Sequence, residues 1–91
     1  MDKTLSKVLV KYGIEQQSLS AVNVLLSLIK EITKAMCDQL DKENLTEAMA
    51  DVKIVIEQMK IYYSISDSDI DKVVQQKIKR LDERMNNGRN S

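Results

Sequence analysis

Two acidic side chains, Glu47 and Asp51, have a spacing that suits metal chemistry. Residues four positions apart lie on one face of a helix, so both carboxylates would point the same way. Carboxylate oxygens are the ligands that Mg²⁺ prefers, and an ion held there would activate water near a bound phosphate. Two interpretations of Asp51 stay open: a ligand or metal contact, or a carboxylate paired with a neighbouring Lys or Arg. Glu47 is the weaker candidate, because it also fits a solvated surface charge.

Composition excludes several other kinds of chemistry. The 91 residues include no histidine, which rules out a Ser-His-Asp triad and a His-ligated zinc site. The one cysteine, Cys37, cannot form an intrachain disulfide, and its apolar neighbours predict a buried, unreactive thiol. Lys+Arg and Asp+Glu both total 14, so the net charge is zero and no nucleic-acid partner is expected. Since no apolar run is long enough to span a bilayer, we expect no membrane partner and a cytoplasmic location.

Helices must position these side chains, because the apolar residues recur with helical spacing and no proline interrupts them. The pattern predicts a short helix from Asp2 to Tyr12, closed by Gly13, and three longer ones covering Glu15–Leu40, Asn44–Tyr63 and Asp67–Met85. We therefore predict an all-α fold, an antiparallel helical bundle of one short and three longer helices. Residues 1–85 would form a single domain, and residues 86–91 a flexible polar tail.

The second of these helices is apolar around more than half of its circumference. One stripe consists of Val22, Leu25, Ile29, Ile32 and Met36, and a neighbouring stripe of Ala21, Val24, Leu28 and Ala35. A helix of this kind is covered from two sides, either at the centre of a bundle or in a subunit interface. Because so short a chain also has a small core, we expect oligomerisation to a homodimer or homotetramer.

Four short motifs follow one another along the chain: Lys11-Tyr12-Gly13-Ile14-Glu15-Gln16-Gln17, then Glu43-Asn44-Leu45-Thr46-Glu47-Ala48-Met49-Ala50-Asp51-Val52, then Ile56-Glu57-Gln58-Met59-Lys60, and finally Lys77-Ile78-Lys79-Arg80-Leu81. In order and spacing they resemble the MazG-like, all-α nucleoside triphosphate pyrophosphohydrolase family. The resemblance covers roughly Leu5 to Met85 and implies the family's helical fold.

The resemblance implies a magnesium-dependent cleavage of nucleoside triphosphates to monophosphate and pyrophosphate. The family holds the metal with Glu-Glu-x-x-Glu on one helix and Glu-x-x-Asp on the next. This chain instead has Asn23-Val24-Leu25-Leu26-Ser27 and Ala48-Met49-Ala50-Asp51, so Asp51 alone remains of that cage. Metal ions contribute several kcal/mol to such transition states, so we expect the chemistry to be largely lost.

Seven residues are the predicted ligand contacts. By the resemblance, Asn23, Ser27 and Asp51 occupy the former metal site, with Glu47 one turn before Asp51. Lys77 and Arg80 match the family's closing basic motif, which faces substrate phosphates, although they also suit a solvated helix end. Lys30 lies one turn beyond Ser27 and could face the same cleft. No catalytic residue, metal site or cofactor is expected, and Mg²⁺ would enter, through Glu47 and Asp51, only if residual activity remains.

Three functions are consistent with this sequence. The first, which we favour here, is a non-catalytic relative that binds or sequesters a nucleotide or nucleotide-derived signal as a homo-oligomer. The second is a weakly active, metal-dependent pyrophosphohydrolase. The third is a helical protein–protein interaction module with a filled cleft. Small divergent members of the resembled family suggest a phage protein, by association alone.

Overall fold

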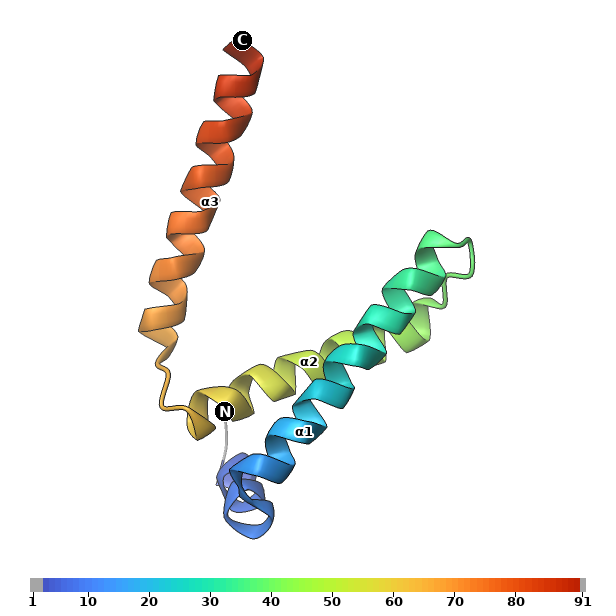
Figure 1. Ribbon diagram of the computed structural model, residues 1–91, viewed down its shortest axis with the longest axis vertical. Helices are drawn as coiled ribbons and strands as arrows, with labels where there is room; N and C mark the ends of the chain where they lie inside the picture. The colour runs from blue at the N-terminus through green and yellow to red at the C-terminus, as the bar shows by residue number, and fades with distance from the viewer. Residues whose placement is uncertain (1–2, 91) are drawn as a thin grey trace.

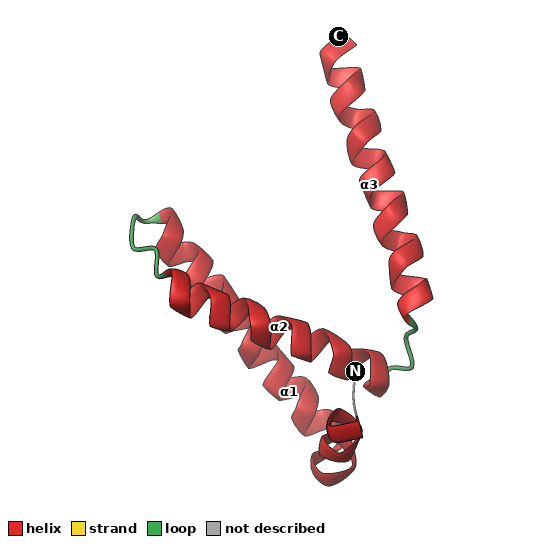
Figure 2. Cartoon of the chain, turned by 180° about the vertical axis from the view of Figure 1, so that it is seen from behind, coloured by secondary structure: helices red, strands yellow, loops and turns green. Residues whose placement is uncertain are grey.

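Three helices make up the structure, a computed structural model that describes residues 3–90. They are α1 (Lys3–Met36), α2 (Lys42–Tyr62) and α3 (Asp67–Asn90), as Figure 1 shows. No strand occurs between residues 3 and 90 (Figure 2). The all-α prediction is therefore confirmed, but the chain has three helices where four were expected.

The difference in helix number arises at Gly13. The two helices predicted on either side of this residue are joined into α1, and Gly13 alone departs from helical geometry, with φ 83° and ψ 161°. Glycine adopts such a positive φ because it has no Cβ. The break expected there is thus a kink within α1 instead of a loop, while the predicted starting residue, Asp2, lies outside the described residues.

Helices α1 and α2 form an antiparallel hairpin, which supplies the core of the described chain (Figures 1 and 2). The buried apolar side chains are Ala21, Ala48, Val55 and Tyr62. Alanines on facing helices allow the two backbones to approach closely, which is why a small seam can be well covered. The antiparallel packing expected of a bundle is therefore present in this pair.

Polar residues set the ends of α2 and α3. The Asp41 carboxylate accepts a hydrogen bond from the backbone N–H of Asn44 at 3.0 Å and caps α2. The Ser66 hydroxyl accepts one from the backbone N–H of Asp69, also at 3.0 Å, as its capping-box spacing predicts. Asp38 and Ser64, in the two connections, both have positive φ, a conformation that short polar residues tolerate.

Helix α3 leaves the hairpin and forms the second arm of a V (Figure 1). It runs on to Asn90, beyond the predicted end at Met85, so the expected flexible tail is helical as far as the structure describes it, and Ser91 lies outside that part. The Cα radius of gyration is 17.0 Å, against about 12 Å for a compact domain of this length. None of the three helices is long and apolar enough to cross a membrane within the described residues.

Candidate functional site

A shallow depression between α1 and α2 brings together three of the predicted ligand contacts, Ser27, Glu47 and Asp51. Glu31, Asn44 and Ala48 complete its lining. Its volume is about 210 Å³, below the roughly 300–1,000 Å³ of pockets that bind small molecules. The antiparallel pairing of the helices thus places residues of the two motifs predicted to share a site side by side, but in a small and open site.

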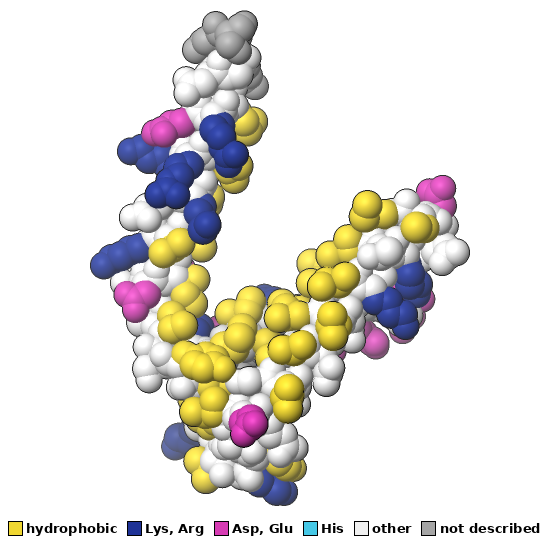
Figure 3. All heavy atoms as spheres, in the orientation of Figure 1, with side chains coloured by type: hydrophobic (Ala, Val, Ile, Leu, Met, Phe, Trp, Pro, Cys, Tyr) yellow, Lys and Arg dark blue, Asp and Glu magenta, His cyan; other side chains and the backbone are white. Residues whose placement is uncertain are grey.

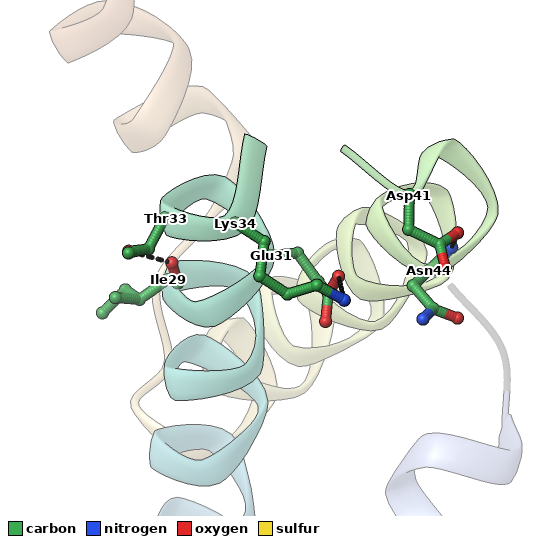
Figure 4. A network of polar contacts seen from close by, with 6 residues as sticks. All are labelled: Ile29, Glu31, Thr33, Lys34, Asp41 and Asn44. Atoms are coloured by element: carbon green, nitrogen blue, oxygen red, sulfur yellow. Dashed lines mark hydrogen bonds and ion pairs between the residues drawn. The ribbon is translucent and has the colours of Figure 1, made fainter. Parts of the chain in front are cut away.

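Helix geometry positions the polar groups at this depression. Asn23 lies one turn before Ser27, and its backbone carbonyl accepts a hydrogen bond from the Ser27 hydroxyl at 3.2 Å. Figure 4 shows the neighbouring contacts: Lys34 forms an ion pair with Glu31 at 3.2 Å, and Asp41 caps the turn that carries Asn44. The Thr33 hydroxyl donates to the Ile29 carbonyl at 2.8 Å, on the same helix.

The charges at the depression are acidic. Glu31, Glu47 and Asp51 contribute carboxylates, and the Glu31–Lys34 pair neutralises one of them in part. None of the ion pairs found among residues 3–90 involves Asp51, so the predicted pairing with a Lys or Arg is not seen there. An uncompensated acidic surface repels triphosphates in the absence of a cation.

The other predicted contacts lie elsewhere. Lys30 is exposed and does not line the depression, where its neighbour Glu31 stands instead. Lys77 and Arg80 lie on α3, where they line a separate surface hollow of about 260 Å³ with Leu81 and Arg84. Within one chain, the basic residues and the acidic depression therefore belong to different sites.

The most extensive functional candidate is an apolar face on the hairpin, where sequence analysis predicted coverage. The stripe of α1 that contains Ala21 and Val24 packs on α2, as expected for one of its two apolar sides. The other stripe is exposed, with Ile29 at 58% and Met36 at 80% of their full accessibility. The prediction that α1 is covered on both sides is not met by this single chain.

Helix α2 extends the same face. Met49, Ile56 and Tyr63 are exposed on it and follow one another at helical spacing. Figure 3 shows apolar side chains gathered over the hairpin and along the side of α3 that faces it. We call the set on the hairpin the hairpin apolar face: Val22, Leu25, Ile29, Ile32, Met36, Met49, Ile56 and Tyr63.

One other expectation for a single side chain needs correction. Cys37 is exposed in the turn after α1, not buried within a helix, because α1 ends at Met36. Of the three tyrosines, Tyr62 is buried, while Tyr12 and Tyr63 are about half exposed. Asn23, a predicted ligand contact, is exposed and does not line the depression.

The joint between α2 and α3 carries a small network of ion pairs. Lys60 pairs with Glu57 at 2.6 Å and also with Asp67, the first residue of α3. The hydrogen bond from Lys60 lowers the pKa of Asp67, and the bonds to Asp67 and Glu57 raise the pKa of Lys60. This network ties the start of α3 to the end of α2.

Comparisons of the chain with protein-family models, with curated proteins and with solved structures found no match. The geometry of the depression and of the hairpin apolar face therefore carries the functional argument. The relationship to the MazG-like family stays a prediction that depends on the order of the sequence motifs.

Proposed function

We propose that the chain is a non-catalytic helical protein that acts through association, as an interaction module assembled from copies of itself. The observation that carries this proposal is the hairpin apolar face. Soluble monomers rarely leave a contiguous apolar surface of this kind open to water, and such surfaces usually mark an interface. We include in the proposal that this module is a divergent, MazG-like phage protein of the cytoplasm. The support for this part is the sequence pattern.

A non-catalytic role is supported by the chemistry of the depression. The described residues contain no group of three or more His, Cys, Asp or Glu side chains placed to hold a metal ion. Glu47 and Asp51 come from one helix. The facing helix offers Glu31, which is paired with Lys34, and Ser27, whose hydroxyl donates to the Asn23 carbonyl. Magnesium needs several well-placed oxygens to compete with its water shell, so this arrangement is a weak ligand set.

Binding of a nucleotide or nucleotide-derived signal is the second candidate. The observation in its favour is the basic hollow of α3, where Lys77, Arg80 and Arg84 offer charged donors for phosphate. The acidic depression on the hairpin cannot serve the same phosphates without a cation. A nucleotide would therefore bind on α3, and little dependence on Mg²⁺ is expected.

Two measurements on the same protein separate these functions. Pyrophosphate release from a panel of nucleoside triphosphates with Mg²⁺ or Mn²⁺ should stay at background, and Asp51→Ala should leave it there. Sedimentation of the full chain should show an oligomer that Ile29→Ser weakens and Lys30→Ser, on the neighbouring polar side, does not. Release that Asp51→Ala abolishes would establish the weakly active hydrolase instead.

A nucleotide panel in a thermal-shift assay tests the second candidate. Saturable stabilisation that Arg80→Gln removes would establish nucleotide binding at α3. A monomeric chain that binds no nucleotide would contradict both candidates.

A further inference from the structure

Helix α3 presents an apolar stripe that residues 3–90 leave largely uncovered: Ile70 is half-buried, and the rest of the stripe is exposed. Ile70, Val74, Ile78, Leu81 and Met85 lie within about 80° of one another on the helix, given 100° per residue. Ile78 and Leu81 are 53% and 52% exposed. Among the described residues, the ion pair that joins α3 to the hairpin lies at the first residue of α3, Asp67. The stripe therefore needs a partner outside this chain.

The spacing of the stripe is that of a two-stranded coiled coil. Val74, Ile78, Leu81 and Met85 alternate at intervals of four and three, which places Ile78 at an a position and Leu81 at a d position. Isoleucine at a with leucine at d favours a parallel dimer over larger assemblies. The stripe thus predicts both the kind of partner, a similar helix, and the number of strands.

Charged residues separate cleanly to the two edges of this stripe. Asp82 lies about 80° to one side of its centre, from the helical rotation per residue, while Asp71, seven residues before Ile78, takes the preceding a position and ends the apolar seam. Lys77, Arg80 and Arg84 lie on the other side. In a parallel pair of identical helices the opposite edges meet, whereas in an antiparallel pair like edges meet. Parallel pairing therefore brings acid against base, and antiparallel pairing brings like charges together.

One contact in the parallel arrangement is specific. Lys77 and Asp82 are five positions apart and flank the a and d residues, the spacing at which charged side chains of neighbouring strands meet. By symmetry, Lys77 of each copy would face Asp82 of the other, so a two-fold dimer makes the contact twice.

The exposed area agrees with what a dimer needs. The chain exposes 7435 Å², whereas a compact monomer of this mass exposes about 5,400 Å². The excess is about 2,000 Å² per chain, or about 4,000 Å² for a pair, within the roughly 2,000–5,000 Å² that obligate homodimers bury. The stripe and the hairpin apolar face both open toward the inside of the V, where a second copy would lie (Figure 3).

We propose that two copies of the chain associate through a parallel, two-fold pairing of α3, with Ile78 and Leu81 in the seam and Lys77 of each copy against Asp82 of the other. This inference depends on the proposed function in requiring self-association. It goes further in assigning the helix, its direction and the contact that selects the direction.

Cysteine cross-linking of the full chain tests the direction. In a Cys37→Ser background, Leu81→Cys should oxidise to a dimer joined at position 81, because every seam residue of a parallel pair faces its own copy, whereas a residues face d residues in an antiparallel coiled coil. Gln76→Cys, on the far side of the helix, is the control and should stay monomeric under denaturing conditions. A Val74→Cys, Met85→Cys variant whose links join only position 74 to position 85 would show antiparallel pairing and overturn the proposal, because a residues face d residues in an antiparallel coiled coil.

Charge reversal tests the specific contact without altering the apolar seam. Lys77→Glu should weaken dimerisation roughly 5- to 30-fold by sedimentation equilibrium, since two surface ion pairs are lost. Adding Asp82→Lys should restore it. Lys79→Glu makes the same charge change away from the seam and should leave the dimer unchanged.

The outcomes separate this proposal from the proposed function. A dimer that Ile29→Ser disrupts but all α3 variants leave intact would overturn the α3 pairing and leave the interaction module standing. A chain that stays monomeric at all concentrations would overturn both.

Discussion

The hydrogen bond between Tyr62 and Gln17 is the best-buried polar contact across the hairpin. The Tyr62 hydroxyl donates to the Gln17 side-chain oxygen at 3.0 Å, and the two residues are 6% and 8% exposed. Burial raises the pKa of Tyr62, so the hydroxyl remains a donor throughout the neutral range. Because both residues sit in the seam, the bond fixes how the end of α2 packs on α1.

Removing this hydroxyl should destabilise the fold measurably. We expect Tyr62→Phe to lower the free energy of unfolding by about 1–2 kcal/mol, because it leaves the buried Gln17 oxygen without a donor. Urea denaturation followed by far-UV circular dichroism measures the change. Tyr63→Phe is the matched control: its bond to the Ser18 hydroxyl is exposed, so we expect less than about 0.5 kcal/mol. Equal effects of the two variants would contradict this ranking.

At the residue scale, the sequence predicted correctly which residues share a surface where the pairing of two neighbouring helices is enough to bring them together. Ser27, Glu47 and Asp51 do meet, because two antiparallel helices with one seam bring them together. Glu31 was missed, although it lies one turn beyond Ser27 on the same face and was therefore detectable. The sequence could not show that Lys77 and Arg80 lie apart from these residues, because their location depends on the direction in which α3 leaves the hairpin.

At the scale of the elements, the joint between α2 and α3 depends on ionised Asp67. Its pKa is lowered, chiefly by the hydrogen bond from Lys60, so the contact stabilises the fold above the ordinary pKa of an aspartate and is lost as the pH falls through the lowered value. We expect NMR titration of the Asp67 carboxyl to give a pKa below the usual value near about 3.9, and Lys60→Met to raise it. An unchanged pKa in Lys60→Met would show that the contact does not form in solution.

The kink of α1 depends on one residue, Gly13. Its φ of 83° and ψ of 161° lie in a region that residues with a Cβ rarely adopt, although a Cβ there would touch nothing within 4 Å. Gly13→Ala should therefore penalise the kinked form by about 1–3 kcal/mol and favour a straight helix. Carbon-13 chemical shifts of residues 11–15 should move toward helical values. Gly88→Ala, within the regular helix α3, is the control and should leave the shape of α1 unchanged.

The sequence predicted which segments are helical, but it predicted less well where one helix ends and whether two helices are joined. The predicted start of α3 at Asp67 is confirmed, and the Ser66 cap that sets it is local chemistry. The joining of two predicted helices at Gly13 did not follow, since a glycine between apolar repeats can end a helix or bend it. The extension of α3 to Asn90 also escaped prediction, because no proline or apolar contact marks where such a polar segment ends.

On the scale of the whole molecule, the sequence could not show how the hairpin and α3 are arranged, nor which apolar surfaces that arrangement leaves exposed. Periodicity showed that α1 is apolar on two sides, but it could not show that α3 would leave the second side open. The apolar residues of the hairpin and of α3 consequently face a shared space (Figure 3). That arrangement leaves a folded chain with few core residues and a large surface suited to association.

A protein stabilised by self-association unfolds at a temperature that depends on its concentration, because dilution favours the dissociated and unfolded chains. For a dimer of this size, a tenfold increase in concentration should raise the melting temperature by about 3–5 °C. Calorimetry over a wide concentration range measures how the melting temperature depends on concentration.

Two variants separate association from the stability of the single chain. Ile29→Ser removes a side chain that is 58% exposed on the hairpin apolar face, so it should weaken the concentration dependence of the melting temperature while changing the stability of the single chain little. Val55→Ala, at a buried position of the α1–α2 seam, should do the reverse: it lowers the melting temperature at every concentration and keeps the concentration dependence. A wild-type melting temperature that does not change with concentration would mean that the exposed apolar surface is not an interface between copies of this chain.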